Sequence, residues 1–412
     1  MREMKDSGIA WIGAIPNHWK VSKIKQIVCW KSVKGQPDLP VLSLYRDYGV
    51  IPKDSRDDNH NVTSLDTSGY KVVERGDLVI NKMKAWQGSL AVSEYNGIVS
   101  PAYHICKITS ENICKKYLHY LLRDASYLPE YMRLSTGLRV GQWDLSFDDF
   151  KNVPFLVPPL AEQERIAAFL DAECAEIDAV LEKTRASIEE YKKLKQAVIT
   201  QAVTKGIRGD RPMKDSGIEW IGEISQDFEI VKLKWLCDIL DQFRSPVTAD
   251  KRNQNADVLY DYYGASGAID KIDSYTIDDH VMLIGEDGAN LRMRNLPIMY
   301  EINGKAWINN HAHILRPKEG VDFHFVFYAL EALDLNYYIT GSAQPKLSQD
   351  NLRNIWIPIT DFSEQKRIAA YISDVCVGLD RLIAKKQQYL TEIENYKKSL
   401  IYEYVTGKKE VV

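Results

Sequence analysis

Two short segments of the chain combine cations, amides and glycines in a pattern that favours contact with a polyanion. The segment NKMKAWQG (81–88) places Lys82, Lys84, Trp86 and Gln87 between two apolar runs. Lysines reach phosphate groups, and a glutamine can pair with both N6 and N7 of adenine. A surface loop with Trp86 packed beneath it accounts for the same residues equally well.

A second segment, GEDGANLRMR (285–294), offers the same chemistry in the other half of the chain. Asn290 carries an amide suited to adenine, while Arg292 and Arg294 can bind phosphate or guanine. Its glycines permit close approach of the backbone. The acidic pair of the segment can accept from cytosine N4, or can order the loop.

Three further polar residues join these candidates for DNA contact. Tyr263 lies in YYGASG (262–267), and Asn310 and His311 lie in WINNHAHIL (307–315). His311 and His313 are expected to project from one face of a strand. Because no third ligand lies nearby in the sequence, polar contact with DNA or a neighbouring loop is favoured over a metal site. A satisfied structural pair is equally compatible.

Motifs for catalysis are missing. VPPL (157–160) lacks the polar first and aromatic last residues of the [N/D]PP[Y/F] motif of methyltransferases, and no GxxxxGK[ST] phosphate loop occurs. The six cysteines are scattered without a CxxC pair, which indicates reduced thiols and no zinc site. The sequence predicts a non-catalytic chain that binds no metal or cofactor itself.

Length and composition indicate a cytoplasmic globular protein of two or three domains. The chain has 412 residues, of which 45% are hydrophobic and 27% charged. No apolar run has the length of a membrane span, and no signal peptide is evident at the N-terminus. The net charge of −4 argues mildly against a nucleic-acid binder, although lysines cluster locally, as in Lys20–Lys34.

The elements that position these residues are duplicated. MKDSGIAWIG begins at Met4 and MKDSGIEWIG at Met213, and Glu162–Gly206 aligns without gaps on Glu364–Lys408. The layout predicts a globular domain at 1–157, a long helix at 158–207, a second globular domain at 208–358 and a second long helix at 359–412. Such a chain carries a pseudo-twofold internal repeat.

Both repeated helices show apolar residues at alternating spacings of four and three, which is a heptad seam. Each is about 65 Å long at about 1.5 Å per residue. Packing the two on each other as an antiparallel coiled coil is the simplest way to bury both stripes. The seam positions are Leu170, Ile177, Leu181 and Ile188 in the first helix, and Ile372, Leu379, Ile383 and Leu390 in the second.

The globular segments are predicted to be α+β, with short strands rich in β-branched residues. Helices are expected at YLHYLLRDA (117–125) and HFVFYALEAL (324–333). An Asn-Gly pair between apolar runs predicts a hairpin turn at EYNG (94–97) and at EING (301–304).

Three motifs carry a family resemblance. The repeated MKDSGIxWIGxI phrase, the helix entry PPLAEQERIAAFLD and the helix end ITQAVTKG resemble the specificity subunit of type I restriction–modification systems. The resemblance implies two target recognition domains that each read one half of a bipartite DNA sequence. It also implies a coiled coil that sets the spacer and docks two modification subunits. S-adenosylmethionine would then belong to those subunits, and ATP and Mg²⁺ to restriction subunits that translocate and cleave DNA.

The resemblance adds two further groups of residues. STGLRVGQW (135–143) parallels TGSAQPKLS (340–348), and in the family this loop often lies near DNA. The candidates in these two loops are Arg139, Gln142, Gln344 and Lys346. Contact with a modification subunit is a second interpretation, after core packing, for Trp11, Ile12, Trp220 and Ile221. An interaction scaffold without DNA binding is the main alternative, and a stand-alone enzyme is disfavoured by the missing motifs.

Overall fold

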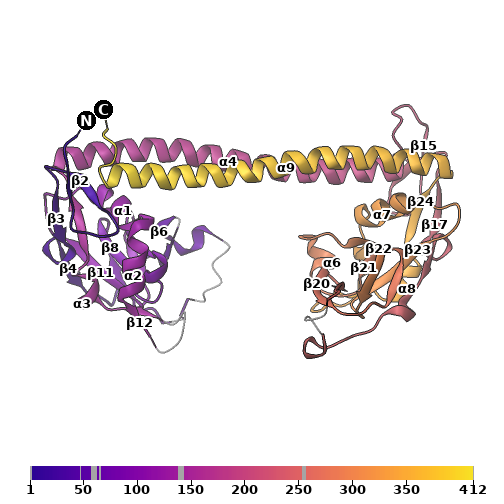
Figure 1. The fold of residues 1–412 in the computed structure, drawn as a ribbon, viewed down its shortest axis with the longest axis horizontal. Coiled ribbons are helices and arrows are strands. Elements are labelled where there is room, and N and C mark those ends of the chain that lie inside the picture. Colours follow the sequence, from indigo (N-terminus) through magenta and orange to yellow (C-terminus); the bar gives the residue numbers. More distant parts are fainter. Residues whose placement is uncertain are drawn as a thin grey trace. The chain divides into compact units, whose positions relative to one another are not determined.

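The computed structural model divides into two compact units, each built from a globular part and portions of both long helices. The structure describes residues 2–46, 48–56, 63–64, 66–137, 143–252 and 257–411. The first unit comprises Met1–Arg185 with Gln388–Val412, and the second comprises Ala186–Gln387. The first unit therefore combines two separate segments of the chain, whereas the second is continuous. The predicted α+β class with paired long helices is confirmed (Figure 1).

The first unit centres on a four-stranded antiparallel sheet in the order β4-β11-β8-β9. These strands are β4 (Val28–Lys31), β8 (Asp77–Asn81), β9 (Leu90–Val92) and β11 (Tyr103–Ile108). Smaller pairs surround it: β1 (Met4–Asp6) with β2 (Ala14–Pro16), β3 (Lys20–Lys23) with β14 (Pro154–Val157), β5 (Leu42–Tyr45) with β6 (Gly49–Pro52), β7 (Lys71–Val73) with β10 (Gly97–Val99), and β12 (Ser135–Thr136) with β13 (Asp144–Leu145). The helices are α1 (Lys115–Arg123), α2 (Leu128–Leu134) and α3 (Phe147–Phe150).

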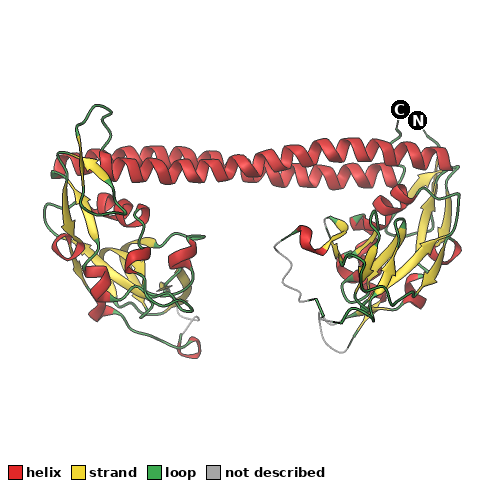
Figure 2. Ribbon diagram, turned by 180° about the vertical axis from the view of Figure 1, so that it is seen from behind, coloured by secondary structure: helices red, strands yellow, loops and turns green. Residues whose placement is uncertain are grey.

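The second unit repeats this plan with a larger sheet, ordered β18-β23-β21-β22-β19-β20. Its strands are β18 (Cys237–Ile239), β19 (Tyr260–Gly264), β20 (Gly267–Ile272), β21 (Ile277–Gly285), β22 (Met299–Ile308) and β23 (Ala312–Pro317). Two pairs flank it: β15 (Met213–Asp215) with β16 (Glu223–Ser225), and β17 (Glu229–Lys232) with β24 (Trp356–Ile359). The helices are α5 (Leu233–Leu236), α6 (Asn290–Met293), α7 (Phe323–Ala332) and α8 (Gln349–Arg353) (Figure 2).

The central strands of both sheets are apolar on both faces because both faces are covered. Leu78 and Ile80 of β8 pack in one core of the first unit, whereas Val79 packs in another. The run Val281–Ile284 of β21 divides in the same way between two cores of the second unit. These buried central strands form the rigid base from which the loops that follow them extend.

The long helices are α4 (Leu160–Lys205) and α9 (Phe362–Val405), and they pair antiparallel within each unit. In the first unit, Lys397 binds Asp178 at 2.6 Å and Arg185 binds Glu394 at 2.7 Å. In the second unit, Lys195 binds Asp380 at 2.8 Å. Lys195 and Lys397 are repeat equivalents, as are Asp178 and Asp380, so the same cross-helix ion pair occurs in both units.

The predicted seam residues lie on the inner side of this pairing. Leu170, Leu181, Ile188, Ile372 and Leu379 are buried, and Ile177, Ile383 and Leu390 are half-buried. Lys195 and Lys397 stand at seam positions of the four-and-three spacing and end in the cross-helix ion pairs described above. They therefore link the helices by charge at positions where an apolar side chain is expected.

The Asn-Gly hairpin predictions were wrong in both units. EYNG (94–97) lies between β9 and β10, but β9 pairs with β8 and β10 pairs with β7. EING (301–304) lies inside the continuous strand β22, where Gly304 has a φ of 105°. Pairing with partners distant in the sequence overrides the local turn signal here. The helices predicted at 117–125 and 324–333 correspond to α1 and α7.

Candidate nucleic-acid interface

Three loops of the second unit are joined by backbone hydrogen bonds. They are the β21 loop (285–294), the turn between β22 and β23 (309–311), and the α8 loop (340–348). The Glu286 N–H donates to the carbonyl of His311 at 2.8 Å, and the Gly288 N–H donates to the carbonyl of Pro345 at 3.0 Å. The predicted contact residues Asn310, His311, Gln344 and Lys346 therefore lie on loops that form one surface.

A charged cluster lies beneath these loops. Glu286, whose side chain is 12% exposed, forms ion pairs with Arg244 and with Lys346, the latter at 2.9 Å. Asp241 accepts hydrogen bonds from His313 at 2.7 Å and from Gln349 at 2.9 Å. The sequence alone did not identify Asp241 or Arg244, because they lie far before these loops along the chain, and it did not identify Gln349, although this residue directly follows the α8 loop.

Both carboxylates of this cluster are held in the charged form. Burial opposes the ionisation of Asp241, but hydrogen bonds from His313 and its other donors lower its pKa overall. Burial likewise opposes the ionisation of Glu286, and its contacts with Lys346 and Arg244 lower its pKa overall. The cluster is thus a compensated set of charges that fixes the loops above it.

The two histidines of the HAH segment have different surroundings, and the expectation that they share one strand face was wrong. His313, on β23, is 1% exposed, and its Nε2 lies 2.8 Å from the carbonyl oxygen of Leu347. His311 precedes the strand, is half exposed, and binds Asp287 at 2.7 Å. Across the described ranges, no group of three His, Cys, Asp or Glu side chains could hold a metal ion.

Three other predicted contact residues stabilise their own loop. The Asn290 amide donates to the carbonyls of Leu296 at 3.0 Å and Pro297 at 3.2 Å. Arg294 donates to the carbonyls of Glu331 and Leu333, and burial lowers its pKa. Arg292 donates to the carbonyl of Ile339 at 3.2 Å. Asn290 and Arg294 use these donors within the fold and are not retained in the interface proposed below, whereas Arg292 is exposed and stays a predicted contact.

The equivalent surface of the first unit is formed by the β8 loop (82–88) and the α3 loop (143–146). Lys82 binds Asp144 at 2.9 Å, and the rings of Trp86 and Trp143 meet edge to face at 5.2 Å. Lys84 and Gln87 are exposed beside this aromatic pair. Trp86 thus packs between the loops, as the structural interpretation expected, while its neighbours on the loop face solvent. Arg139 and Gln142 lie outside the described residues.

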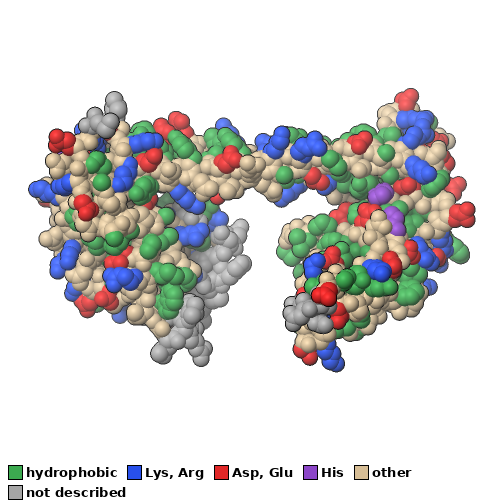
Figure 3. Space-filling view, in the orientation of Figure 1, with side chains coloured by type: hydrophobic (Ala, Val, Ile, Leu, Met, Phe, Trp, Pro, Cys, Tyr) green, Lys and Arg blue, Asp and Glu red, His purple; other side chains and the backbone are tan. Residues whose placement is uncertain are grey.

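Lysines converge beside the β8 loop. Lys71 is 9% exposed and donates from Nζ to the carbonyl of Tyr103. Burial, and then the nearby charges of Lys34 and Lys82, lowers the pKa of Lys71. Elsewhere on the visible face of each unit, cationic and anionic side chains are interspersed (Figure 3).

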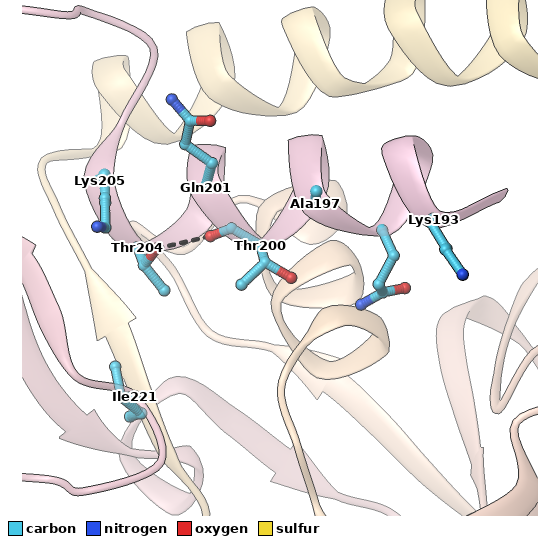
Figure 4. A pocket seen from close by; sticks show the side chains of 8 residues that line it. Lys193, Ala197, Thr200, Gln201, Thr204, Lys205 and Ile221 are labelled. Carbon is cyan, nitrogen blue, oxygen red and sulfur yellow. Dashed lines mark hydrogen bonds between the residues drawn. The ribbon is translucent and has the colours of Figure 1, made fainter. Parts of the chain in front are cut away.

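The four predicted partner residues lie in the framework that the two halves repeat. Ile12 is buried in the first core, and Trp11 packs edge to face on Tyr127 at 6.3 Å. Trp220 stacks on Tyr337 at 4.2 Å, and Ile221 borders an open pocket of about 740 Å³ on α4 (Figure 4). The other lining residues are Lys193, Gln196, Ala197, Thr200, Gln201, Thr204 and Lys205.

Among the described helices, none is long and apolar enough to cross a membrane.

Two units that present non-identical loop surfaces on a shared framework define a class of protein with paired recognition domains. A family model, the type I restriction modification DNA specificity domain, matches residues 16–190 and again 225–395. The chain belongs to this family and contains the domain twice. The resemblance predicted from the repeated motifs is therefore confirmed.

Individual relatives agree with this assignment along nearly the whole chain. The MjaVIII type I restriction enzyme specificity subunit of Methanocaldococcus jannaschii is 26% identical, with 96% of this chain and 94% of the relative covered. A putative MjaX specificity subunit from the same organism is 25% identical over 97% of this chain and 96% of the relative. A solved structure described as "Structural basis underlying complex assembly and conformational transition of the type I R-M system" has the same fold, with a TM-score of 0.71 and 15% identity. That match covers 96% of this chain and 99% of the other.

Proposed function

We propose that each unit reads one half of a bipartite DNA sequence, and that α4 and α9 set the gap between the halves. One observation carries the proposal: the same strand ends support loops of different chemistry in the two units. The first unit presents Lys84 and Gln87, whereas the second presents His311, Gln344 and Lys346. Similar frameworks with different loops are expected if each unit reads a different half-site sequence. We call the base sequence of each half-site a word.

The spacer role is supported by the continuity and pairing of the long helices. Each helix begins in one unit and ends in the other, without a Gly-rich or Ser-rich break that would make it flexible. Repeated ion pairs and buried seam residues hold the pairing in register within each unit. A stiff helical pair can hold the two units so that both contact the same face of the duplex.

We further propose that the chain is non-catalytic and acts through partners. Two modification subunits would supply methyl transfer with S-adenosylmethionine, and restriction subunits would supply ATP- and Mg²⁺-dependent translocation and cleavage. The repeated surface around Trp11 and Trp220, with the α4 pocket beside Ile221, is our candidate for docking the modification subunits. Genomic DNA as the ligand would place the complex in the cytoplasm.

A binding assay with the co-expressed modification subunit tests this function. We expect sequence-selective binding to duplex DNA that weakens steeply with salt, because phosphate contacts release counterions. Incubation of the chain alone with DNA and S-adenosylmethionine should give no methylation. Binding that ignores sequence at every salt concentration would favour the interaction scaffold, and methyl transfer by the chain alone would favour the enzyme.

Gly285→Ala is expected to weaken recognition of the second half-site alone. An added Cβ would lie 2.7 Å from the carbonyl oxygen of Ala265, so the β19–β20 turn beside Tyr263 must move away from the β21 loop. We expect a loss of about tenfold in affinity for DNA with an intact second word, since one lost base contact costs about 1–3 kcal/mol. This loss of affinity is measured by competition binding with duplexes in which either word is scrambled.

Gly378→Ala in α9 is the matched control. Nothing lies within 4 Å of its added Cβ, and alanine favours a helix interior by about 0.5–1 kcal/mol. This variant should be slightly more stable, with both words read normally. If Gly285→Ala leaves preference for the second word unchanged, the Tyr263–Gly267 turn does not belong to the interface.

A further inference from the structure

The same set of loop contacts occurs in both units, although the residues that make it differ. In the first unit, the Leu145 N–H donates to the carbonyl of Lys82 at 2.9 Å, and His104 Nε2 lies 3.1 Å from the carbonyl oxygen of Leu145. In the second unit, the Leu347 N–H donates to the carbonyl of Glu286 at 2.7 Å. His313 Nε2 lies 2.8 Å from the carbonyl oxygen of Leu347.

Strand register shows that these positions are equivalent. His104 lies opposite Ile80 across β11 and β8, and His313 lies opposite Ile284 across β23 and β21. Lys82 and Glu286 each follow those isoleucines by two residues. In both units the clamped leucine is followed by a serine that caps a short helix, α3 or α8. We call each set the loop clamp: Lys82, His104, Asp144 and Leu145, or Glu286, His313, Lys346 and Leu347.

The ion pair of the loop clamp has opposite polarity in the two units. Lys82 binds Asp144 at 2.9 Å, and at the equivalent positions Glu286 binds Lys346, also at 2.9 Å. The partly exposed members are Asp144 at 48% and Lys346 at 55%. The Lys82–Asp144 pair, whose side chains are 32% and 48% exposed, should contribute little to stability, so the geometry that it shares with the second unit points to a role other than holding the unit folded.

We infer that the loop clamp positions the base-reading loops in each unit, and that Lys82 and Lys346 act through this pairing and not as phosphate contacts. This inference rests on the proposed function. The clamp joins the loop after the central strand to the loop before the short helix, and both loops carry candidate contact residues. A salt bridge that works in either polarity can lock a loop position, whereas a phosphate contact requires a cation.

Asp144→Asn separates the two interpretations because they predict opposite signs. If Lys82 contacts phosphate, removal of the neighbouring carboxylate should raise affinity for every duplex. If the pair positions the loops, affinity for DNA with an intact first word should fall about tenfold, by the loss of one base contact, while affinity for unrelated DNA does not fall. Glu286→Gln should have the same effect on the second word alone.

A charge swap gives the sharpest form of the test. Lys82→Glu and Asp144→Lys should each impair reading of the first word, and the double variant should recover most of the parental selectivity because it reproduces the polarity of the second unit. The probe is the complex with its modification subunit, titrated with duplexes in which either word is scrambled. Amide hydrogen exchange across residues 20–157 checks that the first unit is folded in every variant.

Three outcomes are distinguishable. Recovery in the double variant supports the loop clamp. A double variant no better than the single ones, or a general rise in affinity for Asp144→Asn, overturns it. If the parental complex itself reads neither word, the proposed function fails before the loop clamp is tested.

Discussion

Deletion of residues 388–412 is expected to unfold the first unit and to leave the second unit folded. The deleted segment supplies Leu400 and Val405 to the core of the first unit. The hydroxyl of Tyr117 donates to the carbonyl of Val405 at 3.0 Å, and Gly407 packs against Pro16 and Trp19. The second unit keeps its own parts of both helices in the truncated chain.

The expected effect is large because several core contacts are lost together. Truncation of one buried leucine costs about 2–5 kcal/mol, and the net stability of a domain is about 5–15 kcal/mol. Loss of Leu400, Val405 and the whole helix pairing with α4 should therefore cost more free energy than the net stability of the first unit. Amide hydrogen exchange should show loss of protection across 20–157 and retained protection across 229–359.

A chain that ends at Lys408 is the matched control. It keeps Leu400, Val405 and Gly407, and it keeps the bond from Lys408 Nζ to the carbonyl of Ile12 at 3.0 Å. The first unit should then remain protected. Native protection of the first unit in the longer deletion would show that α9 is not part of its folding core.

Insertion of seven residues into both long helices is expected to lengthen the DNA spacer by about three base pairs. Seven residues add about 10 Å of helix, and one base pair spans about 3.4 Å. Insertions after Arg185 and after Gln387 lie where α4 and α9 pass from one unit to the other. If the inserted residues continue the apolar spacing of the helices, the ion pairs of Lys195 and Lys397 remain intact in their own units.

Both DNA words should be unchanged by this insertion, because the loops that read them are untouched. Three base pairs also rotate one half-site by roughly 100° about the duplex, so binding should be weaker than for the parent chain. Selection from a pool of duplexes with variable gaps measures the preferred spacer. Insertion into α4 alone is the control and should abolish binding, since the two helices then differ in length. An unchanged spacer in the double insertion would contradict the ruler role of α4 and α9.

The helical framework could be predicted from the sequence, because two copies of the same 3.6-residue pattern signal one structure twice. The cross-helix pairing of Lys195 and Lys397 also follows from the repeat, since both interrupt an apolar seam. By contrast, the hairpins at EYNG and EING were mispredicted: the strands around EYNG pair with other strands, and EING lies inside β22, which pairs along its length with β21.

The candidate site was harder to predict, because tertiary contacts decide which polar side chains remain available to a ligand. Arg294 has the right chemistry for phosphate, yet its guanidinium binds backbone carbonyls of its own unit. The equivalence of Lys82 and Glu286 was hidden because their charges are opposite. Only the strand register and the shared leucine contacts reveal it.

The central claim is that two different readers act on one duplex at a fixed separation. Single-molecule mapping of methylated bases in DNA from cells that express this chain with its modification subunit tests it most directly. We expect two unrelated short words, separated by a constant number of unspecified base pairs, with one methylated base in each. A single uninterrupted word, or two words whose gap varies from site to site, would contradict it.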